Sequence, residues 1–219
     1  MGDIMINIIL YFSIGLILLG YCYYIYLYIT YNNTKITDDN GFLIIKDIIS
    51  IYDKINVILG EGKFNIYNIK RKVIKLNNKT YYGNDLSNIS LGLMEAGLSV
   101  IDNNKNKFMY YIKYLFNNLV LLYILPVLAI VISLLTYNYI DLNINIIIMV
   151  LLLIIMYMLI DVRTMSFMWI KDNIKRVKTL SRKNIIDIND YINRLLISDK
   201  LIFIGELGLL LRFFAILIS

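Results

Sequence analysis

Few side chains in this sequence can carry out catalysis near neutral pH. The chain contains no histidine, which is the most common general base near pH 7 and a frequent ligand of catalytic zinc. Its single cysteine, Cys22, lies in an apolar run and is interpreted as a small buried hydrophobe, since no disulfide or thiolate cluster can form within the chain. Ser90 and Ser99 have no histidine to activate them. Much hydrolytic chemistry is therefore excluded. Glu95, which lies within a predicted helix, is the main candidate for a catalytic side chain.

The composition is too apolar for a soluble domain. Hydrophobic residues make up 59% of the 219 residues and the mean hydropathy is +0.66, whereas soluble domains contain about 45–50% apolar residues. The net charge of +6 is compatible with an anionic membrane surface or with nucleic acid. Basic residues are mixed with acidic ones, and no alternation of basic and aromatic residues typical of a nucleic-acid platform is present. We expect a mainly α-helical integral membrane protein whose partner is the lipid bilayer, with no nucleic acid bound; the frequent Ile, Asn, Lys and Tyr are typical of an AT-rich genome.

The distribution of charge predicts about four transmembrane helices. Residues 1–34 form the first, because the uncharged run from Ile4 to Thr34 exceeds the roughly 20 residues that cross a bilayer, and it is too long and too rich in tyrosine for a cleaved signal peptide. Residues 114–160 form a transmembrane hairpin of two uncharged stretches, the first of which contains Pro126, a predicted kink.

The last segment, residues 201–219, is long enough to span the membrane but contains two charges. Glu206 and Arg212 are six residues apart and therefore cannot pair along one helix face as an i,i+4 couple would. We expect that the two side chains face other helices or that the segment lies at the membrane interface.

Basic residues indicate the orientation in the membrane. Lys and Arg occur twelve times between residues 35 and 113 and nine times between 161 and 200, but not before Ile4 or in the short connection at 138–141. By the positive-inside rule, both long loops face the cytoplasm and the N-terminus lies outside.

Residues 35–113 have the pattern of a small α+β region. Helical spacing of apolar residues predicts a helix from Gly41 to Leu59, a turn at Gly60-Glu61-Gly62, and short strands at Phe64–Tyr67 and Lys72–Leu76. Asp85 is a plausible N-cap for a helix over residues 86–101, with one buried stripe. The stripe consists of Leu86, Ile89, Leu93, Ala96 and Val100. Residues 161–200 are predicted to form cytosolic amphipathic helices.

The segment Leu93-Met94-Glu95-Ala96-Gly97-Leu98-Ser99 resembles the catalytic helix of the bacterial YugP-like neutral membrane zinc metallopeptidases, whose motif there is H-E-x-G-H. Upstream, the residues from Ile74 to Asn77, Tyr81-Tyr82-Gly83 and Leu86 fall in the register of the family pattern V-R-L-S-x-x-V-Y-x-G-x-S-I. Downstream, residues 161–167 are similar to the family segment P-V-E-F-x-A-S. The resemblance implies a zincin-like α+β insertion between the first two transmembrane helices, and a place in a bacterial cytoplasmic membrane.

The same resemblance indicates that the metal site is degenerate. In this motif, imidazoles at i and i+4 bind zinc on one helix face while the adjacent glutamate reaches the metal-bound water. Met94 and Leu98 occupy those two positions, and Arg163 occupies the position matching the third ligand. A thioether suits copper rather than zinc and leucine has no lone pair, so we expect no metal, and zinc only if the family activity is retained.

Two interpretations of the matching glutamate remain open. Glu95, a vestigial catalytic residue, is either a solvated helix charge or a buried carboxylate that forms an ion pair with Arg163, the arginine supplying the positive charge of the missing metal. For Met94 and Leu98 we expect membership of a second apolar stripe, together with Leu91 and Ile101.

Three hypotheses for function follow. The first is a catalytically inactive pseudopeptidase that binds a polypeptide or a partner membrane protein. The second is an active membrane zinc metallopeptidase with atypical ligands. The third is a small membrane subunit or transporter component without enzymatic activity, in which Glu206 and Arg212 are the residues of interest.

Overall fold

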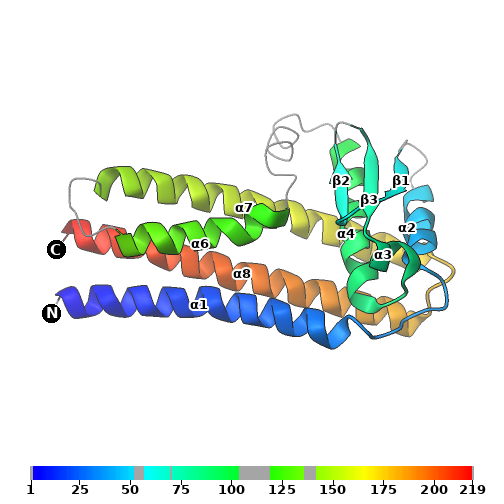
Figure 1. The fold of residues 1–219 in the computed structure, drawn as a ribbon, viewed down its shortest axis with the longest axis horizontal. Coiled ribbons are helices and arrows are strands. Elements are labelled where there is room, and N and C mark those ends of the chain that lie inside the picture. The colour runs from blue at the N-terminus through cyan, green and yellow to red at the C-terminus, as the bar shows by residue number, and fades with distance from the viewer. Residues whose placement is uncertain (1, 52–56, 70, 104–118, 136–141, 219) are drawn as a thin grey trace. The chain divides into compact units, whose positions relative to one another are not determined.

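The computed structural model describes residues 2–51, 57–69, 71–103, 119–135 and 142–218 (Figure 1). The chain divides into two compact units. Unit 1 comprises Met1–Tyr24, Leu119–Ile160 and Ile197–Ser219, and unit 2 comprises Ile25–Asn118 and Asp161–Leu196. The described residues are mainly helical, with one small sheet in unit 2, as the sequence predicts.

Unit 1 is built from four apolar helices. They are α1 (Gly2–Tyr31), α6 (Leu119–Leu135) and parts of α7 (Leu142–Asn173) and α8 (Arg182–Ile218). Pro126 lies inside α6, as expected. Apolar side chains from all four helices form the core of the unit: Leu10, Ile17, Ala129, Met149, Met156, Ile160, Ile202, Leu209 and Phe213.

Among the described residues, three helices are long and apolar enough to cross a membrane. The spans are Ile4–Tyr31, Asn143–Arg176 and Arg182–Ile218, whereas the described apolar part of α6, Ile124–Leu134, is shorter. The sequence prediction of a membrane-spanning α-helical protein is confirmed at this level. Cys22 is exposed rather than buried, so that expectation was wrong. An outward-facing cysteine in an apolar helix is compatible with a lipid-facing position, since the bilayer accepts apolar side chains on the helix surface.

Small residues let α1 and α8 approach closely within unit 1. A Cβ atom at Gly20 would lie 3.1 Å from the Ser198 carbonyl oxygen, and one at Gly205 would lie 2.7 Å from the Ser13 carbonyl oxygen. The Ser198 hydroxyl also donates a hydrogen bond of 2.7 Å to the Gly20 carbonyl. Membrane helices associate through such close backbone contacts, because lipid provides no hydrophobic driving force between them.

Helices α7 and α8 continue through the domain boundaries predicted at residues 160/161 and 200/201. The predicted cytosolic segment 161–200 contains the end of α7, a short 3-10 helix (η2, Ile174–Arg176) and the start of α8. No glycine or proline stands at either boundary to end a helix. The first charged residues after each apolar stretch therefore do not mark the end of either helix.

The α+β part of unit 2 contains a three-stranded sheet. Strands β1 (Ile58–Glu61), β2 (Ile66–Asn68) and β3 (Val73–Leu76) have the spatial order β1-β3-β2. β1 pairs with β3 in parallel, and β2 pairs with β3 antiparallel, with Tyr67 opposite Ile74. The two predicted strands are confirmed as β2 and β3.

The predicted helix at 41–59 was too long, and the turn predicted at residues 60–62 lies partly in a strand. Helix α2 spans Gly41–Ser50, and Ile58–Glu61 is β1. An isoleucine-rich run fits either structure, and here the pairing with β3 decides its second half. Helix α2 and strand β3 both pack against α4 (Leu86–Asn103), and their fully buried apolar side chains are Ile44, Ile45, Ile48, Ile74 and Leu76.

Helix α4 (Leu86–Asn103) agrees with its prediction. The Asp85 carboxylate accepts a hydrogen bond of 2.9 Å from the Asn88 backbone N–H, which is the contact of an N-cap. All five residues of the predicted stripe are at most 2% exposed. A short helix, α3 (Asn78–Tyr82), precedes it.

Candidate functional site around Glu95

Helix α4 presents the predicted site residues toward the interior of unit 2. Met94 and Glu95 are each 4% exposed, and Leu98 is half-buried. Leu91 and Ile101, the other members of the predicted second stripe, are also half-buried. The interpretation of Glu95 as a solvated helix charge is therefore wrong, because its side chain lies inside the unit.

The Glu95 carboxylate binds the edge of the sheet. Its Oε2 atom accepts a hydrogen bond of 2.8 Å from the backbone N–H of Tyr67 in β2. In the sheet that the structure describes, β2 is an edge strand, since β3 is its neighbour on one side only. Glu95 thus satisfies an edge N–H group that β3 does not, and it links α4 to the sheet.

Arg163 of α7 belongs to the same environment. Its side chain is 5% exposed, and its positive charge acts on the Glu95 carboxyl. One turn along α7, the Ser166 hydroxyl donates a hydrogen bond of 2.7 Å to the Met94 carbonyl. A Cβ atom at Gly97 would lie 2.2 Å from the Ser166 Oγ atom. The missing side chain at Gly97 therefore lets α4 and α7 come into contact beside Glu95 and Arg163.

Burial dominates the electrostatics of Glu95. Desolvation raises the pKa of the Glu95 carboxyl from 4.5 to about 7. The hydrogen bond from Tyr67 and the positive charge of Arg163 both oppose this rise, because each favours the ionised form. The Glu95 carboxyl therefore changes its charge near neutral pH.

These residues do not fit a zinc ion. Leu98 offers no donor atom, Met94 offers only a soft thioether, and Arg163 carries a positive charge that would repel a metal ion. Glu95 already uses one carboxylate oxygen to bind Tyr67. Among the described residues, no group of three or more His, Cys, Asp and Glu side chains is placed to hold a metal ion.

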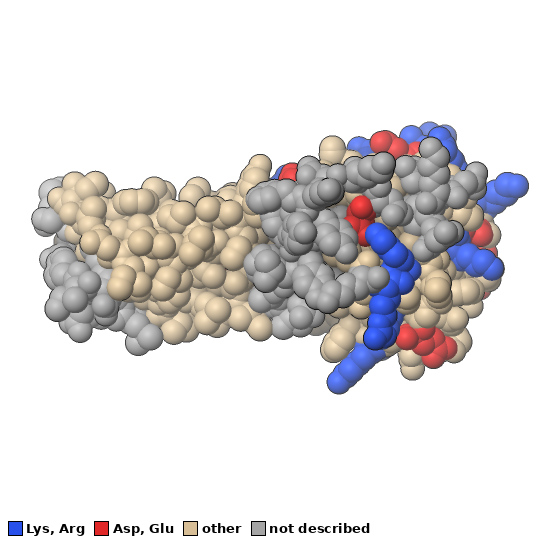
Figure 2. Space-filling model, turned by 90° about the horizontal axis from the view of Figure 1, so that it is seen from above, with Lys and Arg blue, Asp and Glu red and all other residues tan. Residues whose placement is uncertain are grey.

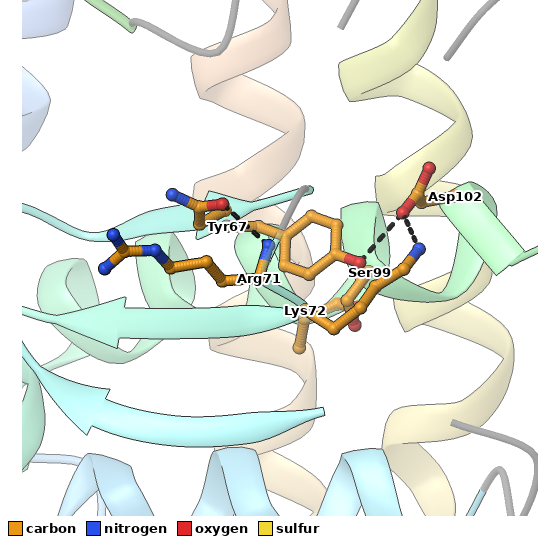
Figure 3. A network of polar contacts seen from close by, with 7 residues as sticks. Tyr67, Arg71, Lys72, Ser99 and Asp102 are labelled. Atoms are coloured by element: carbon orange, nitrogen blue, oxygen red, sulfur yellow. Dashed lines mark hydrogen bonds and ion pairs between the residues drawn. The ribbon is translucent and has the colours of Figure 1, made fainter. Parts of the chain in front are cut away.

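A second polar cluster, which we did not predict from the sequence, lies two turns further along α4 (Figure 3). The Asp102 carboxylate accepts a hydrogen bond of 2.9 Å from the Tyr67 hydroxyl and forms an ion pair with the Lys72 ammonium group. The Asp102 side chain is fully buried, and Lys72 has a left-handed backbone with φ of 52°. Tyr67 therefore contacts α4 twice, through its N–H at Glu95 and through its hydroxyl at Asp102. The seven-residue spacing between Glu95 and Asp102 was the available signal, because it places both carboxylates on one helix face.

The serines considered as nucleophiles have no activating partner among the described residues. The Ser99 hydroxyl donates a hydrogen bond of 2.6 Å to the Ala96 carbonyl of its own helix. The Ser90 hydroxyl is buried without a hydrogen-bond partner in the described part of the chain.

The two charged residues of α8 face the interior of unit 1. Glu206 is fully buried and Arg212 is 6% exposed, so the alternative of an interfacial segment with solvated charges does not fit these side chains. The Arg212 Nη1 atom donates hydrogen bonds of 2.6 Å and 2.9 Å to the carbonyl and hydroxyl oxygens of Ser133 in α6. On the face drawn in Figure 2, the part that holds the helices of unit 1 shows no blue or red side chain.

Comparison with models of known families, with curated proteins and with solved structures finds no match for this chain.

Proposed function

We propose that this chain is a relative of the YugP-like membrane zinc metallopeptidases that has lost catalysis and binds a polypeptide or a membrane-protein partner. The observation that carries the proposal is the environment of Glu95. Its carboxylate is buried, accepts a hydrogen bond from the Tyr67 N–H and interacts electrostatically with Arg163. A metallopeptidase base needs an oxygen free to take a proton from a metal-bound water. In this chain one oxygen of the glutamate is used instead in a hydrogen bond that links α4 to β2.

Loss of the metal supports the same proposal. The i and i+4 positions of α4 carry Met94 and Leu98, and Arg163 supplies positive charge beside the glutamate. A cation in this place stabilises the ionised form of a buried carboxylate, as a metal would, but it cannot activate water.

Strand β1 is the part of the sheet best suited to binding an extended polypeptide. β1 is the second edge strand, and β3 is its partner in the described residues. The backbone N–H groups of Ile58 and Gly62 point toward β3, where they donate to the carbonyls of Lys72 and Leu76. By alternation, the N–H groups of Leu59 and Glu61 point away from β3. An exposed edge of this kind can receive an added strand.

The proposal includes a position in the membrane. We place the chain in a bacterial cytoplasmic membrane with four crossings, α6 included, the N-terminus outside and unit 2 in the cytoplasm. The excess of Lys and Arg in residues 35–113 and 161–200 supports this orientation. Cysteines introduced in each loop and labelled with an impermeant maleimide in intact cells test it.

The metal content of the purified full chain tests the loss of catalysis. We expect no stoichiometric zinc and no chelator-sensitive hydrolysis of a quenched-fluorescence casein. Replacing all three ligand positions (Met94→His, Leu98→His and Arg163→Glu) is expected to restore zinc binding, since the geometry of the helix is intact. The matched control restores the two histidines and keeps Arg163, whose charge should oppose the metal. Tight zinc in the natural sequence would return the active-peptidase alternative.

The binding of an unfolded polypeptide tests the second half of the proposal. Fluorescently labelled, reduced and carboxymethylated lactalbumin serves as the probe, with the full chain in lipid nanodiscs. Leu59→Pro removes one outward N–H of β1 and leaves the donors to β3 in place, so it is expected to weaken binding. Ile186→Ala, a change at an exposed side chain of α8 in unit 2, is the control. Equal affinity of all three proteins, or no binding by the natural sequence, would refute the peptide-binding role.

A second candidate, a subunit or transporter component without enzymatic ancestry, is favoured by the burial of Glu206 and Arg212 in a helix long enough to span the membrane. Loss of a cellular phenotype on replacing these two residues, together with indifference to changes at Glu95, would support it over the pseudopeptidase.

A further inference from the structure

Glu206 is a buried carboxyl group with no described hydrogen-bond partner. It lies in the apolar part of α8, and its side chain is 0% exposed. Within the part of the chain that the structure describes, neither Oε1 nor Oε2 receives a hydrogen bond. A bare carboxylate in such a place is strongly disfavoured, because the ion loses its hydration in an apolar interior.

The surroundings of Glu206 contain little that could compensate its charge. Helices α6 and α7 contribute no charged residue to unit 1. Helix α1 contributes Tyr21, whose phenol is close enough to interact electrostatically with the Glu206 carboxyl. On α8 itself, Arg212 donates to Ser133 of α6, Asp199 is a further acid, and the side chain of Lys200 is exposed.

Close packing around Glu206 disfavours a metal ion as its counter-charge. The neighbouring glycine Gly205 lies against α1, where an added Cβ would be 2.5 Å from an Ile17 carbon and 2.7 Å from the Ser13 carbonyl oxygen. The Ser13 hydroxyl is itself engaged, since it donates to the Ile9 carbonyl at 2.6 Å. Hard cations need about six or more oxygen ligands, and among the described residues no group of three or more His, Cys, Asp and Glu side chains could hold such an ion.

We propose that Glu206 is a proton-binding site within the membrane-spanning part of the chain, and that its proton exchanges with water. A neutral carboxylic acid needs no counter-ion and can be buried where a carboxylate cannot. Ionisable groups inside membrane helices are characteristic of proton pathways, and α8 carries this one between the buried Asp199 and Arg212. The site is independent of the proposed peptide-binding role of unit 2.

Infrared difference spectroscopy of the full chain in nanodiscs tests this site. The spectrum of the natural sequence minus that of Glu206→Gln should contain the C=O band of a protonated carboxylic acid at neutral pH. The band should shift to lower frequency in heavy water, because the bound proton exchanges, and it should be unaffected by saturating sodium chloride. Asp199→Asn, a change at another buried acid of α8, is the matched control and should retain the band.

Three results would overturn the proposal. They are a carboxylate band in place of the acid band, an acid band that does not respond to heavy water, and an acid band that disappears when sodium is added. A thermal unfolding measurement covers the event that a variant misfolds. Gln has the shape of a protonated Glu, so Glu206→Gln should keep the melting temperature of the natural sequence, whereas a carboxylate held by an ion pair would lose stability on this change.

Discussion

The charge of Glu95 should make the stability of unit 2 depend on pH in an unusual direction. Burial raises the pKa of the Glu95 carboxyl from 4.5 to about 7, so the folded protein holds this proton where the unfolded chain has released it. Between pH 4.5 and 7 the folded state therefore binds more protons than the unfolded state, and the contribution of Glu95 to stability falls as pH rises. At about 1.4 kcal/mol per pKa unit, the fall amounts to about 3 kcal/mol across this window.

Glu95→Gln isolates this effect. The amide oxygen can still accept the N–H of Tyr67, but it does not titrate. The free energy of unfolding of the variant minus that of the natural sequence should be small at pH 4.5, should grow toward pH 7 and should then level off. The intrinsic fluorescence of Trp169, the single tryptophan, reports unfolding of unit 2, to which it belongs.

Arg163→Gln is the companion variant. The positive charge of Arg163 opposes the rise in the Glu95 pKa. Removing this charge should therefore extend to higher pH the range over which stability falls. A difference between Glu95→Gln and the natural sequence that stays flat from pH 4.5 to 7 would refute the reasoning, because burial would then not control this carboxyl.

Three further changes test the packing. Gly20→Ala should lower the melting temperature in detergent by an amount equivalent to about 1–3 kcal/mol, because the added methyl group meets α8. Gly15→Ala is the control and should not lower it, because an added Cβ there meets nothing within 4 Å. Equal effects of the two changes would exclude the close approach of α1 and α8 as the cause. Asp102→Asn removes the charge that pairs with the partly exposed Lys72 ammonium and that accepts the hydrogen bond of the Tyr67 hydroxyl. Because solvent screens Lys72, the change should cost about 1–2 kcal/mol in guanidinium unfolding, and no measurable loss would show that the cluster does not link α4 to the sheet. Gly97→Ala should destabilise unit 2 by about 1–3 kcal/mol, and a simultaneous Ser166→Ala should recover part of that loss, since it removes the atom that the new methyl group meets.

The local signals in the sequence were sufficient for α4. Its apolar stripe has helical spacing, and Asp85 precedes it as a cap, so both the element and its buried face could be predicted. The uncharged stretches likewise indicated helices for a membrane, because length and apolarity are properties of each segment alone.

Features that depend on distant residues could not be predicted in the same way. Strand β1 contains Gly60 and Glu61, which indicate a turn locally, and its strand conformation depends on pairing with β3. The bond between Tyr67 and Asp102 joins residues 35 positions apart, and the bond between Tyr67 and Glu95 joins residues 28 apart. The resemblance to a metal motif directed attention to Arg163, but it gave no indication that the glutamate binds a strand.

Because the Glu95 carboxylate accepts the hydrogen bond of the Tyr67 N–H, the addition of a further strand to the sheet at β2 is disfavoured. A strand from a second molecule could pair there only by displacing a buried acid from its acceptor role. In the described residues, no buried carboxylate occupies the outward N–H groups of β1 in the same way. Self-association by strand addition should therefore run through β1, and truncation of Glu95 to alanine would open a second face to aggregation, so that chains able to stack only in pairs become able to polymerise.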